Sequence, residues 1–261
     1  RTIRVGVGLA YCLALSPDGT QVTASGSPRQ GAQRQTFIWN LETDDAPLSL
    51  PTESGIPLQV AASFFSTDGR LLAIRSTGGI QIWDVTKRSL IRTFPTGNMR
   101  AFPFAFSPDG FRIAIANTMQ GSLRIHEIKT GREIRRIEAH RPGTVTLALD
   151  YSPNGRFVAS SASDNSLRVF DAKTGTMLRK FYGDKRSMGA ISFGPESMRI
   201  ASLSLYYSVQ VWDLAAAMGT FRTKFNNVKC IKFHPTEPIV ALAGGRSEVR
   251  LYDLNSRLLL R

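Results

Sequence analysis

The sequence predicts an all-β fold in which one four-stranded antiparallel sheet is repeated along the chain. The first of two supporting signals is a turn, Ser-Pro-Asp-Gly in its clearest copies, whose second residue stands at positions 17, 67, 108, 153, 195 and 235. The second signal follows each turn as an apolar residue, an aromatic residue or histidine, and a polar residue. These triplets are Ile38–Asn40, Ile82–Asp84, Ile125–Glu127, Val169–Asp171, Val211–Asp213 and Leu251–Asp253. All three tryptophans occupy the aromatic position, which establishes the repeat.

Each repeat contains four short runs with the composition of β-strands. In the third repeat they are Phe104–Phe106, Arg112–Ala116, Ser122–Ile125 and Glu133–Ile137. Proline presets φ at the turn between the first two runs, and glycine allows the chain to reverse there. The charged fourth run suits a wet outer edge, where it discourages edge-to-edge pairing. Four strands joined by tight turns describe one blade of a β-propeller.

Six blades are predicted, centred on residues 10–50, 58–95, 102–138, 146–182, 188–224 and 228–261, and the whole chain 1–261 is interpreted as a single propeller domain. The runs Arg1–Val5 and Arg257–Arg261 both align with a fourth strand, which is one fourth strand more than six blades need. We therefore predict a seven-bladed parent ring, of which this chain, beginning with Arg1 and not with Met, is a segment. The alternative is a six-bladed ring with a spare or displaced terminal strand.

These repeats resemble the WD-repeat (tryptophan–aspartate repeat) family, in degenerate copies that cover nearly the whole chain. In that family a histidine, a serine or threonine, an aspartate and a tryptophan form a buried hydrogen-bond chain that stiffens each blade. The best copy supplies His140, Ser160 and Asp164, whereas Phe170 replaces the tryptophan and has no indole N–H to donate. The resemblance therefore implies a shortened network in the fourth blade.

The other repeats depart further from the family pattern. The aspartate position holds Gln33, Thr77, Gln120, Tyr206 and Arg246, and the histidine position holds Glu53, Gly97, Asp184 and Asn226. We expect these blades to depend on apolar packing in place of the polar network. Trp39, Trp83 and Trp212 are interpreted as blade-to-blade packing residues, and His140 as a structural histidine.

Charge and composition restrict the partners and the compartment. The net charge is +13, and residues 131–261, with 20 basic and 11 acidic side chains, are more basic than residues 1–130, with 13 and 9. This imbalance favours an acidic protein, a nucleic acid or an anionic surface as partner, unless the charges only solvate the strand edges. No apolar run approaches the length of a membrane span. Cys12 and Cys230 are expected to be buried reduced thiols, which favours a cytoplasmic, intracellular location.

The sequence carries no recognisable catalytic or cofactor motif. Its three histidines fall in different parts of the repeats, so we expect no metal site and no cofactor. The aspartates of the repeated turns recur with the period of the fold, which indicates a structural role. We predict that the domain is not an enzyme; the alternative is a propeller enzyme whose acids gather at the central channel.

The resemblance implies that the loops between the second and third strands share one face with the loops between successive repeats, and family members commonly bind partners there. An enlarged first loop, Ser27–Arg34, brings Arg29 and Arg34, and the fifth repeat offers the pair Tyr206 and Tyr207. The remaining basic candidates for this face are Arg141, Lys185, Arg186 and Arg246. The first loop could instead be a tolerated insertion, and one tyrosine could fold into the core.

We therefore predict a non-catalytic protein–protein interaction scaffold that binds an acidic protein or peptide on this basic face. The alternative is a binder of nucleic acid or another polyanion through the basic second half of the chain. No base-reading motif supports the alternative.

Overall fold

The computed structural model describes residues 9–27, 35–43, 46–50, 62–76, 78–96, 103–117, 119–183, 187–204, 208–216, 218–224, 228–244, 248–256 and 258–260. Within them the chain forms 23 strands and no helix. The contacts divide the chain into two compact units, and each is described by itself. The first unit comprises residues 1–100 with the short segments 109–111 and 128–131, and the second comprises the rest.

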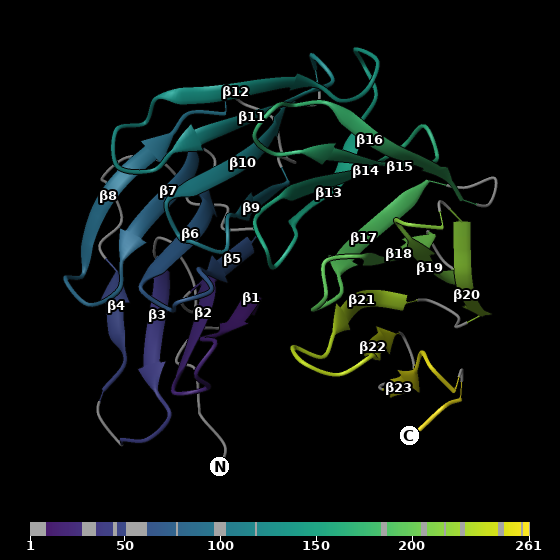
Figure 1. Cartoon of the computed structure of the whole chain (residues 1–261). Helices are drawn as coiled ribbons and strands as arrows, with labels where there is room; N and C mark the ends of the chain where they lie inside the picture. The colour runs from purple at the N-terminus through teal and green to yellow at the C-terminus, as the bar shows by residue number, and fades with distance from the viewer. Residues whose placement is uncertain are drawn as a thin grey trace. The chain divides into compact units, whose positions relative to one another are not determined.

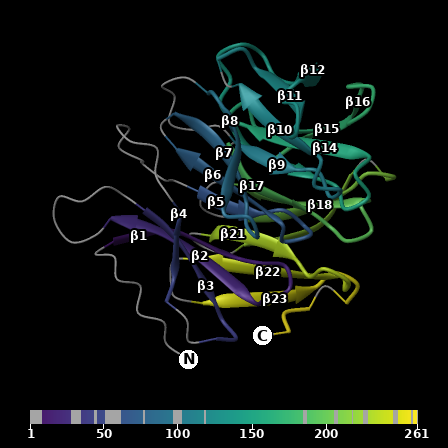
Figure 2. The ribbon, with the colours of Figure 1, turned by 90° about the vertical axis from the view of Figure 1, so that its left-hand side faces the viewer.

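The first unit contains two four-stranded antiparallel sheets, ordered as in the sequence. Their strands are β1 (Leu9–Leu15), β2 (Gln21–Ser27), β3 (Gln35–Asn40) and β4 (Leu48–Leu50), and β5 (Ala62–Phe65), β6 (Leu71–Ser76), β7 (Gly79–Asp84) and β8 (Ser89–Phe94). The order β5 to β8 can be followed in Figure 2. Strands β1 and β5 are neighbours, and Ile38, Leu72 and Trp83 belong to the core between the sheets.

The second unit contains four further antiparallel sheets. Their strands are β9 (Phe104–Phe106), β10 (Arg112–Asn117), β11 (Ser122–Glu127) and β12 (Glu133–Glu138); β13 (Thr146–Tyr151), β14 (Phe157–Ala162), β15 (Ser166–Asp171) and β16 (Met177–Tyr182); β17 (Met188–Phe193), β18 (Arg199–Ser204), β19 (Ser208–Asp213) and β20 (Met218–Lys224); and β21 (Val228–Phe233), β22 (Ile239–Gly244) and β23 (Val249–Asp253). The first strands β9, β13, β17 and β21 lie side by side in chain order (Figure 1). The predicted repeat of antiparallel sheets is confirmed.

The Ser-Pro-Asp-Gly turns are held by side-chain hydrogen bonds. In the first turn the Ser16 hydroxyl donates to the Asp18 carboxylate (2.5 Å) and accepts the backbone N–H of Gln21 (2.8 Å). The hydrogen bond from Ser16 lowers the pKa of Asp18. Gly19 has φ +74°, a left-handed conformation that glycine adopts without strain. The same hydroxyl-to-carboxylate bond joins Ser66 to Asp68 (2.6 Å), which accords with a structural role for these acids.

The sixth sheet has three strands and only the beginning of a fourth. Leu259 forms an isolated bridge with Tyr252, and the Leu260 N–H donates to the Leu251 carbonyl (2.7 Å). The predicted terminal fourth strand Arg257–Arg261 is therefore present in part, although both of its end residues lie outside the described residues. The other terminal run, Arg1–Val5, also lies outside them. The seven-bladed parent and the single-domain interpretation stay predictions.

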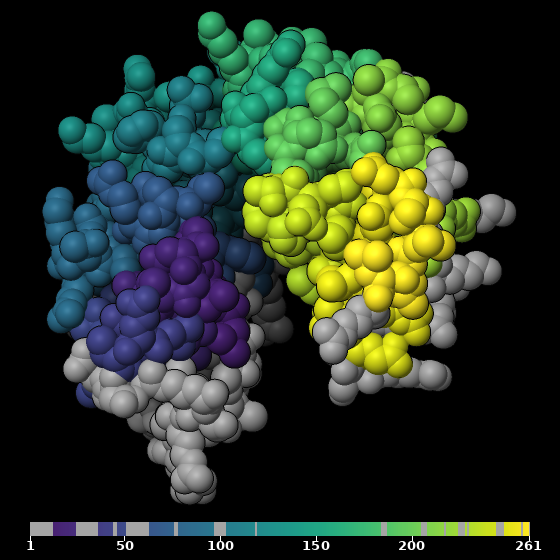
Figure 3. All heavy atoms as spheres, turned by 60° about the horizontal axis from the view of Figure 1, so that its bottom comes forward, coloured from purple at the N-terminus to yellow at the C-terminus, as the bar shows by residue number. Residues whose placement is uncertain are grey.

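One face of the sixth sheet is less buried than the corresponding face of the fifth. In the fifth sheet, four apolar positions pack against the sixth sheet: Ala201, Leu203, Val209 and Val211. Their counterparts one repeat later are only partly buried or exposed: Ala241, Ala243, Val249 and Leu251. Within the described part of the second unit no further sheet covers this face. Leu258, Leu259 and Leu260 are exposed, and the yellow C-terminal part of the chain lies at the surface in Figure 3. The predicted burial of Cys230 is therefore wrong, because this thiol lies on the first strand of the same sheet and is exposed.

Candidate functional site

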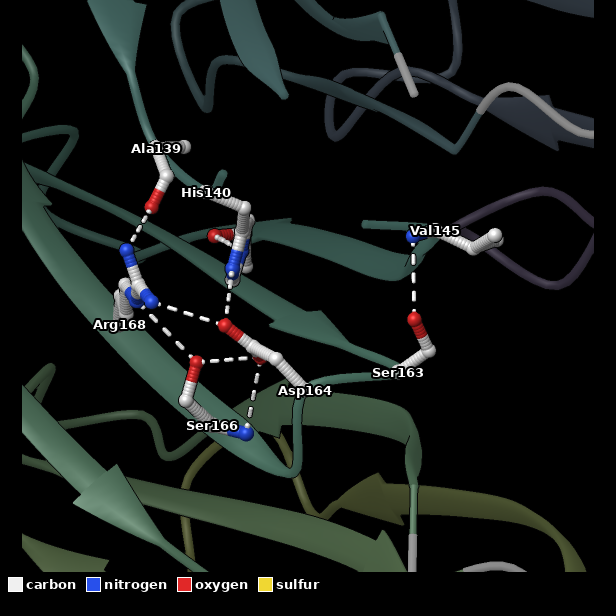
Figure 4. Close-up of polar contacts among 8 residues, drawn as sticks. Ala139, His140, Val145, Ser163, Asp164, Ser166 and Arg168 are labelled. Atoms are coloured by element: carbon white, nitrogen blue, oxygen red, sulfur yellow. Dashed lines mark hydrogen bonds and ion pairs between the residues drawn. The ribbon is translucent and has the colours of Figure 1, made fainter. Parts of the chain in front are cut away.

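The fourth sheet carries a polar network at the loop end of the blade. The Nε2 atom of His140 lies 2.9 Å from the Ser160 hydroxyl. Its Nδ1 atom lies 3.4 Å from the Asp164 carboxylate (Figure 4). His140 comes from the segment between β12 and β13, Ser160 from β14, and Asp164 from the loop before β15. The three residues that match the family pattern are thus brought together across three elements.

Two further residues complete this network, and the sequence reasoning did not identify them. The Arg168 guanidinium donates to the Asp164 carboxylate (2.8 Å), to the Ser166 hydroxyl (3.1 Å) and to the Ala139 carbonyl (2.5 Å). The Ser166 hydroxyl donates to the same carboxylate (2.6 Å). We call the set His140, Ser160, Asp164, Ser166 and Arg168 the fourth-blade network. The sequence signal that could have revealed Arg168 was its spacing of four residues from Asp164, on the other side of a turn.

Burial and hydrogen bonding set the charges in this network. Burial lowers the pKa of His140 below its usual 6.5, against the opposing effect of Asp164, so the ring is neutral at physiological pH. For Asp164, burial acts to raise the pKa, but the Ser166 hydroxyl and the His140 ring outweigh it and hold the pKa below 3.8. A neutral His140 ring beside an ionised Asp164 carboxylate suits a structural role, in which these side chains hold the loops in place.

The network holds two loops together. The backbone N–H groups of Ala139 and His140 both donate to the Gly121 carbonyl (3.0 and 2.8 Å). Gly121 has φ +66°, and a Cβ atom at this position would lie 2.3 Å from the His140 carbonyl oxygen. On the other side, Val145 and Ser163 exchange two hydrogen bonds of 3.0 and 2.9 Å. The loops are therefore placed by backbone contacts that tolerate little displacement.

Three side chains on these ordered loops reach the solvent. Met119 is 65% exposed and Val145 is 42% exposed, and Arg141 is also exposed between them in the sequence. The Gly143 N–H donates to the Met119 carbonyl (3.3 Å), so the two loops are in contact. We call Met119, Arg141 and Val145 the loop patch. It offers two exposed apolar side chains and one exposed cation on loops that are in backbone contact.

Arg141 is the one predicted partner-binding residue that the described chain includes. The other seven lie outside the described residues: Arg29, Arg34, Lys185, Arg186, Tyr206, Tyr207 and Arg246. Sequence reasoning did not identify Met119 or Val145, because an apolar residue in a strand-rich sequence is expected in the core.

The predicted packing residues are buried. Phe170 belongs to the core between the third and fourth sheets, and Trp39, Trp83 and Trp212 are each less than 10% exposed. Two tryptophans also donate hydrogen bonds, Trp212 Nε1 to the Ser202 hydroxyl (2.8 Å) and Trp83 Nε1 to the Gln81 side chain (3.2 Å). Apolar packing alone therefore does not describe the eroded blades.

The described residues contain no group of three or more histidine, cysteine, aspartate or glutamate side chains placed to hold a metal ion. They also contain no helix with the length and apolar character needed to cross a membrane.

Comparison with known proteins identifies the repeat. The family model described as WD domain, G-beta repeat, matches residues 131–171, which include the whole fourth-blade network. A structure titled "Crystal Structure of Mitotic Checkpoint Complex" superposes with a TM-score of 0.78 at 17% identity, covering 95% of this chain and 77% of that chain. The chain is a WD-repeat β-propeller. At 17% identity the superposition supports the fold alone.

Sequence relatives of this WD-repeat propeller include larger proteins. Transcription initiation factor TFIID subunit 5 of Caenorhabditis elegans is 29% identical over 74% of this chain and 30% of the relative. WD repeat-containing protein SL1-17 of Schistosoma mansoni is 28% identical over 55% and 46%. Transcriptional corepressor LEUNIG_HOMOLOG of Arabidopsis thaliana is 22% identical over 96% and 31%. The chain thus spans less than half the length of these relatives.

Proposed function

We propose that this propeller is a non-catalytic interaction scaffold that binds an acidic segment of a partner protein on its loop-bearing face. Family membership supports the scaffold role, as do relatives named as a subunit of a transcription factor and as a corepressor. Rigid sheets that present loops are suited to recognition, because the scaffold positions the binding groups before the partner arrives.

The observation that carries this proposal is the loop patch above the fourth-blade network. Arg141 offers a cation to a carboxylate or phosphate, and Met119 and Val145 offer apolar surface beside it. Because backbone bonds to Gly121 and Ser163 hold the loops, little conformational entropy is lost when a partner binds. An acidic segment with an apolar residue next to its carboxylate fits this arrangement.

The long-range field favours the same partner. The chain carries a net charge of +13, so an acidic protein is attracted before contact and a basic one is repelled. The family resemblance alone assigns Arg29, Arg34, Lys185, Arg186, Tyr206, Tyr207 and Arg246 to partner binding as well.

Affinity purification with charge-reversed variants tests the proposal. Partner recovery should fall about tenfold with Arg141→Glu, because a charge-assisted bond at the interface is lost and a like charge is introduced. It should fall further when Lys185→Glu, Arg186→Glu, Tyr206→Ala and Tyr207→Ala are combined. Arg156→Glu is the matched control, since this exposed arginine lies at the opposite end of β14 from the loop patch. Equal recovery with all three proteins would reject the loop-bearing face as the binding site.

The high positive charge also favours the second candidate, a polyanion binder. Binding to mixed-sequence RNA or DNA should then weaken steeply with salt, because each phosphate contact releases counterions. A protein partner held mainly by the loop patch should show a much smaller salt dependence. The absence of catalytic activity and the cytoplasmic location stay predictions.

A further inference from the structure

A groove lies at the opposite, turn-bearing end of the second unit. Its volume is about 620 Å³, and it runs between the β17–β18 turn and the β21–β22 turn. The lining residues are Pro195, Glu196, Met198, Arg199, Asp213, Thr236 and Pro238. A groove of this size falls within the range of ordinary small-ligand sites, roughly 300–1,000 Å³. We call it the turn groove.

The turn groove lies beside the sixth turn, which has lost the glycine that lets neighbouring turns pack closely. In the fourth turn, a Cβ atom on Gly155 would lie 3.3 Å from Pro108 of the preceding turn, so the two turns pack closely. The fourth and fifth turns are joined by a bond from the Asn154 N–H to the Ser197 hydroxyl (3.1 Å). In the sixth turn the glycine position holds Glu237, whose larger side chain does not allow the same close packing against the neighbouring turn.

The sixth turn is also organised differently. The first four turns use a serine hydroxyl at this position, and the fifth has Gly194 there. In the sixth, His234 accepts the backbone N–H groups of Thr236 (3.4 Å) and Glu237 (3.1 Å) through its Nδ1 atom. The described residues with left-handed φ include Ser197 at the glycine position of the fifth turn but do not include Glu237. The sixth turn therefore follows a different path, and space opens beside the fifth.

The groove combines apolar walls with negative charge. Pro195, Pro238 and Met198, which is 39% exposed, supply the apolar surface. Two carboxylates, those of Glu196 and Asp213, and one guanidinium also line the groove. That guanidinium belongs to Arg199, which lies 3.6 Å from Glu196.

Asp213 is held in a fixed position at the edge of the groove. Its Oδ1 atom accepts the backbone N–H groups of Ala215 (2.7 Å) and Ala216 (2.9 Å). A carboxylate placed in this way can receive a cation without first losing side-chain freedom.

We propose that the turn groove binds a peptide segment in which a lysine or arginine follows an apolar residue. The apolar side chain lies against Met198 and the two prolines, and the cation pairs with the carboxylates of Asp213 and Glu196. The charge argument selects this occupant. The chain is strongly basic as a whole, so a local excess of carboxylates is the surface that attracts a basic side chain and repels an acidic one. This surface is separate from the loop patch and has the opposite charge preference.

Fluorescence anisotropy with four labelled decapeptides tests this proposal. Each probe has Gly-Ser flanks around a central pair, which is Leu-Arg, Leu-Lys, Leu-Gln or Leu-Glu. With the Arg141→Glu protein, in which the loop patch no longer favours an acidic probe, the first two should bind at least about tenfold more tightly than Leu-Glu, a difference of about 1.4 kcal/mol. General electrostatics cannot give this order, because a net charge of +13 favours the Leu-Glu probe.

Matched variants locate the binding. Asp213→Asn keeps an oxygen for the two backbone N–H groups but removes the charge, and it should weaken the Leu-Arg probe about tenfold. Asp171→Asn is its control, since Asp171 stands at the same position in the fourth sheet and also accepts two backbone N–H groups. Met198→Ala should weaken the Leu-Arg and Leu-Gln probes alike, whereas Phe111→Ala, at the same turn position of the third repeat, should weaken neither.

Each outcome of these measurements either supports or overturns the proposal. Tighter binding of the Leu-Arg probe that is lost in Asp213→Asn and kept in Asp171→Asn supports the proposal. Equal affinity for all four probes, absence of binding at millimolar peptide, or binding that Asp213→Asn leaves intact overturns it. Arg141→Glu should leave this binding unchanged, so the result is independent of the loop-bearing face.

Discussion

The fourth and fifth sheets hold complementary halves of one polar network. The fourth sheet has the histidine, the serine and the aspartate, but phenylalanine stands in the place of the tryptophan. The fifth sheet keeps the tryptophan, and Trp212 donates to Ser202, the counterpart of Ser160 one repeat earlier. Its aspartate and histidine positions, Tyr206 and Asp184, lie outside the described residues.

The shared element of the two halves is a buried serine. Ser160 and Ser202 are both almost fully shielded from solvent, and a buried hydroxyl without a partner is costly. The fourth sheet provides a partner from the loop side, the ring of His140, whereas the fifth provides one from the neighbouring strand, the indole of Trp212. Either half of the family network is thus enough to satisfy the buried serine in these two sheets.

The largest effect that tests this comparison is expected at Trp212. Its ring is buried and stacks on Phe181 at a centroid distance of 5.0 Å. Trp212→Ala should lower the free energy of unfolding by about 3–5 kcal/mol, measured by urea denaturation, because a large cavity is created. Trp212→Phe fills most of the space but leaves the Ser202 hydroxyl unpaired, and should lower it by about 1–3 kcal/mol. If Trp212→Phe is neutral, the indole bond is not what supports the fifth sheet.

The repeat was predictable because it is encoded by local chemistry. Each turn needs proline, a short polar side chain and glycine within four residues, and each sheet needs an aromatic residue at a fixed distance from it. The sheets accordingly begin and end close to the predicted blade limits, as in the fourth, which spans Thr146–Tyr182.

Features that depend on contacts between elements were not predictable in the same way. The role of Arg168 depends on its reach to the Ala139 carbonyl in another element, which no spacing reveals. The exposure of Cys230 depends on whether a further sheet covers its face, and the strand pattern around it is that of a covered strand. The turn groove follows from Glu237 at a glycine position, a signal visible in the sequence whose structural consequence was not.

The next largest effect is expected at His140. His140→Leu keeps an apolar side chain of similar size but leaves the fully buried Ser160 hydroxyl without its partner. Asp164 retains its bonds from Arg168 and Ser166, so the loss should be about 1–3 kcal/mol of unfolding free energy. Combining His140→Leu with Ser160→Ala should recover part of this loss, because no orphan hydroxyl remains. Equal destabilisation in the single and double variants would contradict this explanation.

A pH effect should distinguish the two half-networks. Burial holds the pKa of folded His140 below the 6.5 of the unfolded chain. As pH falls below that value the unfolded chain takes up a proton that the folded ring resists. The stability that the neutral His140 ring contributes above pH 6.5 is therefore lost as the pH falls, by at most about 1.4 kcal/mol per pH unit.

The measurement is urea denaturation of three proteins between neutral pH and pH 5. The stability difference between wild type and His140→Leu should shrink as the pH falls, since only the wild type carries the titrating ring. The difference between wild type and Trp212→Phe should stay constant, because neither the indole nor the serine titrates in this range. A parallel pH dependence of both differences would show that the titrating group lies outside the fourth-blade network.

The smallest effect is expected where the two sheets are joined. Asp150 on β13 accepts the backbone N–H of Phe193 on β17 (2.7 Å), and burial raises the pKa of this carboxyl despite the opposing charge of Lys232. Because folding raises the pKa of Asp150, its contribution to stability is fully present below pH 3.8, the pKa in the unfolded chain. That contribution is lost as the pH rises through the pKa in the folded protein, so the ionised carboxylate at neutral pH lowers the free energy of unfolding. Asp150→Asn keeps an oxygen acceptor for Phe193 without that charge.

Asp150→Asn should therefore be as stable as wild type or up to about 1 kcal/mol more stable at pH 7. The advantage of the variant should decline as the pH falls toward 4, because the wild-type carboxyl then takes up its proton in the folded state. Asp150→Leu is the control, since it removes the acceptor and should be destabilised at every pH. A loss of more than about 2 kcal/mol in Asp150→Asn at pH 7 would mean that attraction to Lys232 outweighs the cost of burying the charge, and that this pair helps to hold the two half-networks in register.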